Sequence, residues 1–536
     1  MKRPELVNAT QAELDEILVL TKTTLPAQQY ELLERVLGTF VFVMQSLQNA
    51  KMSIKRFRQM LFGARTESKG NVLKEVLKDH VVSAASEATP VEGDPDAKPS
   101  PPGHGRNGAQ AYRDSPVVEL ALPALQPGDP CPECTTGKVY EAPPKVIVKV
   151  LGQPPLAATV YKLQQLRCRL CDARFTAPVP EGARAPKYDH SCASMLALLR
   201  YGSGMPFYRL EGLQANLNVP LSDATQWDIV AKAVAGPRAA FEELIRQAAQ
   251  AQLLYNDDTP ARILSLMRER AAAEAAGQTP QAKAINTSGI VAEREGRKMV
   301  LFFTGHAHAG QNLAKVLAHR AKELGPPMQM CDALAANLSP EFATIVGHCM
   351  AHGRRKFADA VAHFPKECRT VIEVLATVYA ADAHCRAAQM SPAQRLVHHQ
   401  AASGPPLQGL HQWMNEQLEQ RQVEPNSCLG AALRYMLKHW SALTLFLRQA
   451  GAPLDNNTCE RVLKRAIRHR RNSLFYKTDN GAAVGDIYMS LIHTCQLGNV
   501  NAFAYLQVLQ IHAQDVLARP ALWMPWNYRA QLAHPA

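Results

Sequence analysis

The stretch AQLLYNDDTPARILSL, residues 251–266, places Asp257 and Asp258 directly after an apolar run. Farther along come SGIVAERE, RKMVLFFTG, the helical pattern GQNLAKVLAHRAKEL and the apolar stretch PMQMCDALAANL, which carries Asp332. Apolar runs bounded by turn residues predict three strands, a helix and a fourth strand in that order. We expect Asp257 on the first strand and Asp332 at the end of the fourth, with these two strands adjacent and the two side chains facing each other.

This order of elements is typical of a ribonuclease-H-like fold, in which helices pack on a mixed sheet. Residues 341–448 then have a mostly helical pattern, so a helical insertion at about 341–450 is expected before the last helix of the domain. With 536 residues, of which 47% are hydrophobic, the chain can bury several cores. The sequence therefore predicts a multidomain α+β protein.

A third acidic residue lies in LDNNTCERVLKRAIRHRR, residues 454–471, which opens with helix-capping residues and places Glu460 in the first turn. Glu460 could simply pair with Lys464 one turn later, and each acid by itself has an ordinary structural explanation. Three converging carboxylates repel one another unless divalent cations neutralise them. Mg²⁺ prefers carboxylate oxygens, and two ions about 4 Å apart suit phosphodiester chemistry. We therefore expect two Mg²⁺ (or Mn²⁺) ions to be bound by Asp257, Asp332 and Glu460.

Basic residues accompany this predicted metal site. The formal net charge is +12, which suits a polyanionic partner, and arginine side chains match phosphate geometry. His348 and His352 have helical i, i+4 spacing, which is compatible with a metal site, but packing and phosphate contact are the favoured interpretation. We expect the nucleic acid to contact a set of basic side chains: Arg354, Arg355, Lys356, Arg461, Lys464, Arg465, Arg468, Arg470 and Arg471.

Two cysteine pairs, CPEC and CRLC, lie in a β-rich segment, residues 113–180. Each pair has two intervening residues on a tight turn, and two such pairs can form a tetrahedron around Zn²⁺. A bound metal supplies folding free energy that a small segment otherwise lacks. Coincidental free cysteines are the alternative, and a redox dithiol is disfavoured because one pair would suffice for it. The predicted ligands of this structural zinc ion are Cys131, Cys134, Cys168 and Cys171.

Apolar residues recur every seven positions near the N-terminus, at Leu33, Phe40, Leu47, Ile54 and Leu61. This spacing predicts a coiled coil and hence a homo-oligomer, although an amphipathic helix packed on its own chain would show the same pattern. The N-terminal residues lack the apolar core of a signal peptide, and nowhere do 18 apolar residues run together. We therefore expect a soluble cytoplasmic protein with reduced cysteines and no contact with a membrane.

The segment PFYRLEGLQANLNVPLSDATQWDIVAKAV, residues 206–234, predicts two short helices joined by a turn, with Asp223 and Gln226 in capping-box spacing. Such a pair is either a helix-turn-helix that reads DNA or an ordinary packing unit. The complete predicted order is a helical, coiled-coil region (1–85), a flexible linker (86–112), the zinc-binding module (113–180), a helical, helix-turn-helix-like region (181–250), a catalytic domain (251–480) and a C-terminal helical tail (481–536).

Eight short motifs then occur in an order typical of one known family: LFGARTES, GHGRNGAQAY, the CPEC and CRLC pairs, YGSGMPFYRLEGL, NDDTP, CMAHGRRKF, LDNNTCERVLKRAIRHRRNSLF and IYMSLIHTCQLGNVNAFAYL. With these motifs, the chain resembles the transposases of the insertion-sequence 66 family, which belong to bacterial mobile elements. The likeness extends from about Glu31 to Tyr528.

The resemblance implies a DDE-type DNA transposase, in which metal-bound acids direct first water and then a freed 3′ hydroxyl at DNA phosphates. By position, the first acid of the family falls on Asp257 and the last on Glu460. The second rests less specifically on Asp332, because CDALAANL departs from the family's usual sequence. The implied partners are double-stranded DNA, as element ends and target, and small proteins encoded by the same element. A decayed zinc-dependent DNA-binding or regulatory protein and a nuclease without strand transfer are the alternative functions.

Overall fold

The computed structural model describes residues 186–277 and 284–533 continuously, together with shorter stretches between residues 20 and 184. The chain divides into two compact units, Met1–Val148 and Lys149–Ala536. Apart from Leu33, the predicted coiled coil lies outside the described residues, and so does the predicted linker. Each helix within the described ranges is too short or too polar to cross a membrane.

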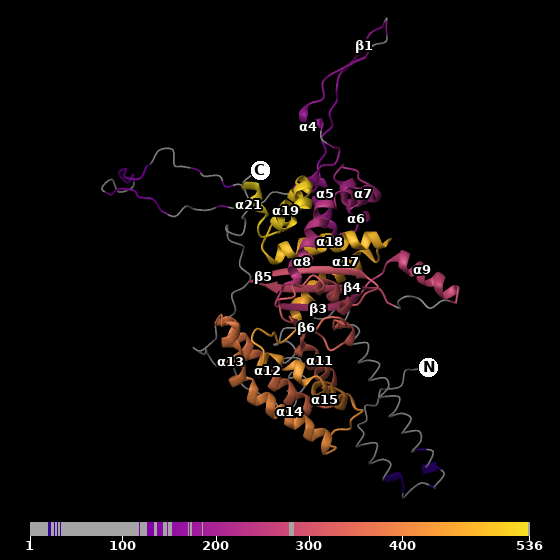
Figure 1. Cartoon of the computed structure of the whole chain (residues 1–536), viewed down its shortest axis with the longest axis vertical. Helices are drawn as coiled ribbons and strands as arrows, with labels where there is room; N and C mark the ends of the chain where they lie inside the picture. Colours follow the sequence, from indigo (N-terminus) through magenta and orange to yellow (C-terminus); the bar gives the residue numbers. More distant parts are fainter. Residues whose placement is uncertain are drawn as a thin grey trace. The chain divides into compact units, whose positions relative to one another are not determined.

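A mixed five-stranded sheet lies in the second unit, with the strand order β5-β4-β3-β6-β7. Figure 1 labels its strands β5, β4, β3 and β6. The central strand β3 pairs with β4 in antiparallel fashion and with β6 in parallel. The predicted strands and the helix before the fourth strand, α10 (Ala309–Leu317), occur in the predicted order, but an additional helix, α9 (Leu264–Ala275), lies between the first and second strands. The strands are β3 Leu253–Pro260, β4 Asn286–Arg294, β5 Arg297–Gly305, β6 Met328–Cys331 and β7 Ile345–His348.

The short strand β7 was not predicted, and it precedes the helices of the insertion that the sequence predicts at about 341–450. Its sequence, IVGH, is too short to show an alternating pattern, and it is extended because it pairs with β6. The helical insertion starts directly after this strand and encloses a hydrophobic core of its own. Its helices are α11 Met350–Ala360, α12 Pro365–Ala387, α13 Pro392–Ala402, α14 Gly404–Glu419, α15 Cys428–Lys438 and α16 Trp440–Leu443.

Helix α18 (Asp479–Leu497) packs along the edge strand β5 and is buried over most of its length. Three of its side chains, spaced by four residues, accept N–H groups of alternate β5 residues at 2.6–3.0 Å: Asp486 from Thr304, Ser490 from Phe302 and Thr494 from Val300. An unpaired edge would offer these groups to another chain. The start of the predicted C-terminal tail is therefore part of the core. The neighbouring helices are α17 Asn457–Ser473, α19 Ala502–Ile511, α20 Ala513–Ala518 and α21 Tyr528–Ala533.

Residues 190–250 are helical, as predicted, but the predicted capping box of Asp223 and Gln226 is wrong. Ser222 caps the second helix of the pair by accepting from the N–H of Thr225, while the buried Gln226 donates to the Leu221 carbonyl. The helices of this region are α5 His190–Ala197, α6 Phe207–Asn216, α7 Asp223–Lys232 and α8 Ala235–Ala249.

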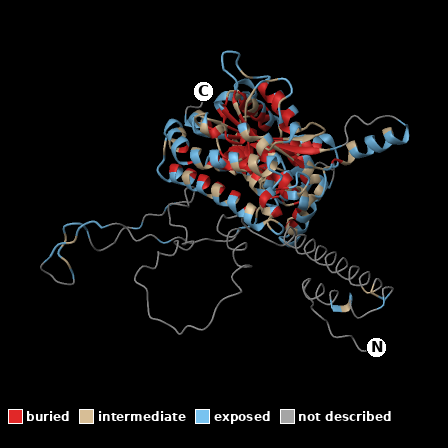
Figure 2. Cartoon of the chain, turned by 90° about the horizontal axis from the view of Figure 1, so that it is seen from below, coloured by how far each residue is buried: buried red, intermediate tan, exposed pale blue. Residues whose placement is uncertain are grey.

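Buried residues are concentrated in the sheet and on the helix sides that pack against it (Figure 2). Helix α9 (Leu264–Ala275), which follows β3, contrasts with this arrangement because none of its residues is buried. Ahead of these elements, a small hairpin is formed by β1 Gln165–Arg167 and β2 Arg174–Thr176, followed by α4 Glu181–Arg184. The fold thus leaves β3, with an acidic residue on each face, at the centre of the sheet.

Candidate active site

The strand register brings Asp257 and Asp332 together. Tyr255 of β3 is paired with Met330 of β6, and continuing this parallel register by two residues places Asp257 beside Asp332. Neighbouring strands are about 4.8 Å apart, so the two carboxyl groups originate from adjacent backbones. The predicted location of these two acids on neighbouring strands agrees with the structure.

Helix α17, which carries Glu460, packs across β3 and β4. The helix can come close because the β4 partner of Asp257 is Gly289. A Cβ atom at this glycine would lie 2.9 Å from Leu463 Cδ2, and the Cys459 thiol donates to the Gly289 carbonyl at 3.2 Å. The missing side chain thus lets the first turn of α17, and Glu460 with it, approach Asp257.

Asn456, the residue just before α17, holds the helix in this position. It is fully buried, its side chain donates to the Asn256 carbonyl of β3 at 3.1 Å, and its backbone N–H donates to the Cys349 thiol at 3.2 Å. Leaving a buried polar group without its partner costs about 1–3 kcal/mol. From the sequence Asn456 is only a helix-capping residue, because its partner on β3 lies 200 positions away.

The Asp257 carboxyl group has a pKa raised to about 7. Burial is the largest cause, and the carboxylates of Asp332, Glu460 and Asp258 raise the pKa further. The backbone N–H of Asp258, which donates to Asp257 Oδ1 at 2.8 Å, acts in the opposite direction. A carboxyl group in this environment favours a proton or a cation. The three predicted acids therefore share one electrostatic environment, although their oxygens do not all lie within 4.8 Å of one another.

Asp332 is held by the loop that follows β6. Its Oδ1 accepts from the N–H of Leu334 at 3.0 Å and from the side-chain amide of Asn337. The Asn337 carbonyl in turn accepts from the side chains of Asn256 and Gln329, both at 2.7 Å. This buried amide network positions the acid within CDALAANL. The sequence does not identify these amides as part of the site, because their contacts join separate strands.

Asp258 has a different environment from its neighbour. Its carboxylate accepts from Ser288 Oγ at 2.7 Å and from the N–H of Ala309 at 2.9 Å, and it lies 3.0 Å from His308 Nδ1. These partners join β3 to β4 and to the start of α10. Asp258 therefore connects the helix to the sheet, and its oxygens already have protein partners.

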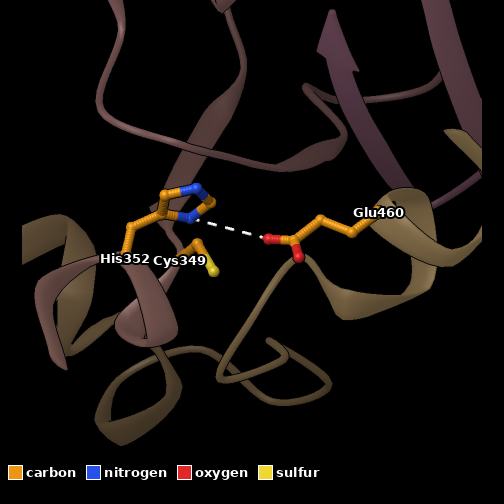
Figure 3. Close-up of side chains that lie close together, drawn as sticks. All are labelled: Cys349, His352 and Glu460. Carbon is orange, nitrogen blue, oxygen red and sulfur yellow. Dashed lines mark ion pairs between the residues drawn. The ribbon is translucent and has the colours of Figure 1, made fainter. Parts of the chain in front are cut away.

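His348 and His352 do not form a metal site together. His348 is buried and packs edge-on against His439, with ring centroids 5.1 Å apart. His352 instead faces Glu460, with 3.7 Å between Nδ1 and Oε1. Together with the Cys349 thiol, His352 and Glu460 form a group whose metal-ligating atoms all lie within 4.8 Å of one another (Figure 3). The helical spacing of the two histidines gave no indication of this group.

The predicted nucleic-acid contacts are not equivalent in the structure. Arg470 donates to Thr259 Oγ1 at 3.2 Å and to the Pro260 carbonyl, so it is anchored to the end of β3. Arg354 and Arg465 are half-buried. The remaining residues are exposed, and those on α17 follow one helical face: Arg355, Lys356, Arg461, Lys464, Arg468 and Arg471.

Three of the four cysteines of the two pairs are among the described residues. In the first unit, Cys131 donates its N–H across a turn to the Gly137 carbonyl at 2.8 Å. In the second unit, Cys168 and Cys171 lie between β1 and β2. Cys134 lies outside the described residues, so the four-cysteine zinc site stays a prediction.

A family model described as "Transposase IS66 family" matches residues 187–484 of the chain. Three similar proteins of Sinorhizobium fredii (strain NBRC 101917 / NGR234) bear names that describe no activity. Uncharacterized protein y4jD is 24% identical over 385 residues, which cover 68% of this chain and 71% of the relative. Uncharacterized protein y4hP is 22% identical over 519 residues, with 89% and 88% coverage, and uncharacterized protein y4qI is 27% identical over 203 residues, with 37% of each chain covered.

The segment matched by the family model is more than half of the chain and contains all three predicted acids, Asp257, Asp332 and Glu460. It also includes the five-stranded sheet and the helical insertion. The resemblance inferred from the motifs is thereby confirmed: this chain belongs to the transposase IS66 family.

Proposed function

We propose that this protein is a DDE-type DNA transposase that binds the ends of its element, cleaves DNA phosphodiesters and joins the freed 3′ hydroxyl to target DNA. The observation that carries the proposal is that the parallel register of β3 and β6 places Asp257 beside Asp332, while α17, whose first turn carries Glu460, packs across β3. The strand order, with an antiparallel hairpin on one side of β3 and parallel strands on the other, supports a ribonuclease-H-like fold. Membership in the family supports an enzyme that acts on DNA.

The three acids suit hard divalent cations. Their ligand atoms are carboxylate oxygens, which Mg²⁺ and Mn²⁺ prefer, and positive charge would relieve the repulsion among them. A bound pair of such ions activates the attacking oxygen and stabilises the leaving oxygen of a displacement at phosphorus. Asp257, Asp332 and Glu460 are the residues that would hold the ions.

The surrounding residues hold these acids in place before DNA arrives. The loop after β6 donates two hydrogen bonds to Oδ1 of Asp332, which leaves Oδ2 for an ion. Asn456 fixes the first turn of α17 on β3 and thereby restricts Glu460. Ligands that are already positioned lose less conformational freedom when the reacting complex forms, so more of the binding energy is available for the reaction.

The DNA backbone would lie along the exposed basic residues of α11 and α17, since exposed lysine and arginine side chains neutralise phosphates. The helix pair α6–α7 gives weaker support to DNA reading. The exposed side of α7 carries Asp228 as well as Lys232, which suits a phosphate backbone poorly, and Gln226 packs between the two helices. Packing is therefore the better supported role of this pair. A substitution of Lys232 that changed sequence preference would overturn that assignment.

A structural Zn²⁺ ion held by Cys131, Cys134, Cys168 and Cys171 is part of the proposal. The connection between β1 and β2 supports it, because it carries Cys168 and Cys171 and a tight turn presents a thiolate pair to an ion. Zinc measured per chain in the wild type and in Cys168→Ser tests this site. Equal zinc content in the two proteins would refute the four-cysteine zinc site.

The assembly and partners proposed are a homo-oligomer formed through the N-terminal heptads and small proteins encoded by the same element. Light scattering on the purified full chain tests the first part, and a monomer at all concentrations would refute it. Co-purification with products of the neighbouring reading frames tests the second.

The decisive experiment incubates the full chain with labelled DNA that carries the element ends, with and without Mg²⁺, and maps the cut. We expect Mg²⁺-dependent cleavage by the wild type and none by Glu460→Gln, while end binding stays nearly unchanged because the substitution removes only a metal ligand. End binding without metal-dependent cleavage in the wild type would favour a decayed regulatory protein. Cleavage without joining of pre-cut ends would favour a nuclease.

A further inference from the structure

A thiol, an imidazole and a carboxylate meet beside the proposed catalytic acids. Cys349 lies just before α11, His352 in the first turn of α11 and Glu460 in the first turn of α17, and their ligand atoms all lie within 4.8 Å of one another (Figure 3). The thiol is fully buried, whereas the side chains of His352 and Glu460 are 27% and 25% exposed. An ion could therefore reach the cluster from the solvent side.

The distances are close to those of a metal centre. Ligands at about 2.0–2.3 Å from one tetrahedral ion are separated from each other by roughly 3.3–3.8 Å. His352 Nδ1 and Glu460 Oε1 are already 3.7 Å apart, and the other separations need to shorten by about 1 Å or less to reach this range. Rotation of side chains is sufficient for such a change.

One ligand atom of the cluster lacks a competing partner, and a second has a partner that is compatible with metal binding. His352 Nδ1 is buried and has no hydrogen-bond partner within the part of the chain that the structure describes, since 3.7 Å from Glu460 exceeds hydrogen-bond length. The Cys349 thiol accepts the N–H of Asn456 at the start of α17, an arrangement that stabilises a thiolate. Burial raises the pKa of Cys349 to about 12, so a metal ion must displace the thiol proton, which leaves to solvent.

We propose that Cys349, His352 and Glu460 form a binding site for a thiolate-preferring divalent ion such as Zn²⁺. Thiolate and imidazole select Zn²⁺ and related transition metals, whereas Mg²⁺ prefers oxygen ligands alone. An ion at this site uses the carboxylate that the proposed Mg²⁺ pair also needs. Occupancy therefore inhibits DNA cleavage by removing Glu460 from the acids on β3 and β6. The proposed metal site does not depend on the proposed function, whereas the proposed inhibition rests on that function.

The binding test adds Co²⁺ as a spectroscopic probe to the full chain after a chelator has removed bound metal, so that zinc does not already occupy the site. Co²⁺ bound to a thiolate produces an intense charge-transfer absorption, and the wild type should gain one such ion more than Cys349→Ala. The matched control is Cys428→Ala, which removes an exposed thiol of the insertion and should behave as the wild type. Because loss of the buried thiol could disturb folding, His352→Gln provides a second variant. It should bind the probe at least about tenfold more weakly.

Equal Co²⁺ stoichiometry and absorption in the wild type, Cys349→Ala and His352→Gln would refute the site. The inhibition is tested by adding Zn²⁺ to the Mg²⁺-dependent cleavage reaction, with each protein compared with its own rate without Zn²⁺. The zinc concentration for half inhibition should rise at least about tenfold in Cys349→Ala. An unchanged value would refute the inhibitory role. Absence of cleavage in every protein would refute the proposed function instead, and the Co²⁺ result would still decide the binding site.

Discussion

The adjacent acids Asp257 and Asp258 lie on opposite faces of β3 and have different environments. Asp258 has a hydroxyl, a backbone N–H and an imidazole around its carboxylate, and it joins the sheet to α10. Asp257 has one backbone donor, and burial, with a smaller contribution from the acids near it, raises its pKa to about 7. Successive side chains of a strand point to opposite faces, so this difference follows from the strand itself. A carboxylate whose oxygens both have hydrogen-bond partners has a structural role. A buried carboxylate that lies near other carboxylates instead indicates a site for an external cation.

The largest expected effect is on cleavage. Asp257→Asn should lower the Mg²⁺-dependent nicking rate on the order of 10³-fold or more, because it removes a ligand from the proposed ions. End binding, measured in parallel, should remain because the change leaves the basic residues intact. Asp258→Asn serves as the matched control on the opposite face and should keep measurable cleavage when folded. Equal loss in the two variants would contradict the division between the faces.

The second effect is on stability in the absence of divalent ions. The folded pKa of Asp257, about 7, exceeds its ordinary value of 3.8, so the folded chain binds this proton more tightly than the unfolded chain. Wild-type stability should therefore fall as pH rises from about 4 to about 7, by at most about 4 kcal/mol at 1.36 kcal/mol per pKa unit.

Asp257→Asn should abolish this part of the pH dependence and be more stable than the wild type near pH 8, with the advantage vanishing near pH 4. Urea unfolding in a chelator, at several pH values, measures the difference. Parallel stability curves for the wild type and the variant would show that folding does not raise the pKa of Asp257.

The third effect concerns the face of β3 on which the Asp258 carboxylate has hydrogen-bond partners. Asp258→Asn replaces one carboxylate oxygen by an NH2 group, which cannot accept a hydrogen bond, so the oxygens that accept from Ser288 and from Ala309 are no longer both present. The substitution should lower the free energy of unfolding by about 1–3 kcal/mol. Added Mg²⁺ should not restore the loss, because the proposed ions bind on the other face. Recovery of wild-type stability with Mg²⁺ would place Asp258 among the metal ligands. Thermal or urea unfolding with and without Mg²⁺ distinguishes these outcomes.

The smallest effect distinguishes two arginines of α17. Arg468 is exposed, whereas Arg470 is anchored to the end of β3. Arg468→Gln should reduce the slope of log affinity against log salt by about 0.9 if the side chain neutralises one phosphate. Arg470→Gln should leave that slope unchanged and instead reduce stability. Titrations of end DNA at several salt concentrations measure the slopes, and identical slopes for both variants and the wild type would remove Arg468 from the DNA contacts.

Much of the sheet could be predicted because its signals are local. The apolar runs of β3, β4, β5 and β6 and the helical pattern of α10 are readable in short windows, and the structure has them in the expected order. The strand β7 could not be predicted, because four residues carry no period and their extended backbone depends on pairing with β6. The cap of α7 was also misassigned, since Asp223 and Ser222 are both suitable capping residues and only the backbone geometry distinguishes them.

The sequence by itself determined the family, the excess of positive charge and three acids in motifs that suit metal-dependent chemistry on DNA. Tertiary structure decided which acid of the Asp257–Asp258 pair faces the other two, through the pleat of β3 and the partners on each face. The tertiary structure also decided that α17 packs closely over Gly289 and that Asn456 binds the start of this helix to β3 by a hydrogen bond. These contacts join residues far apart in the chain, and local composition and spacing contain no information about such pairs.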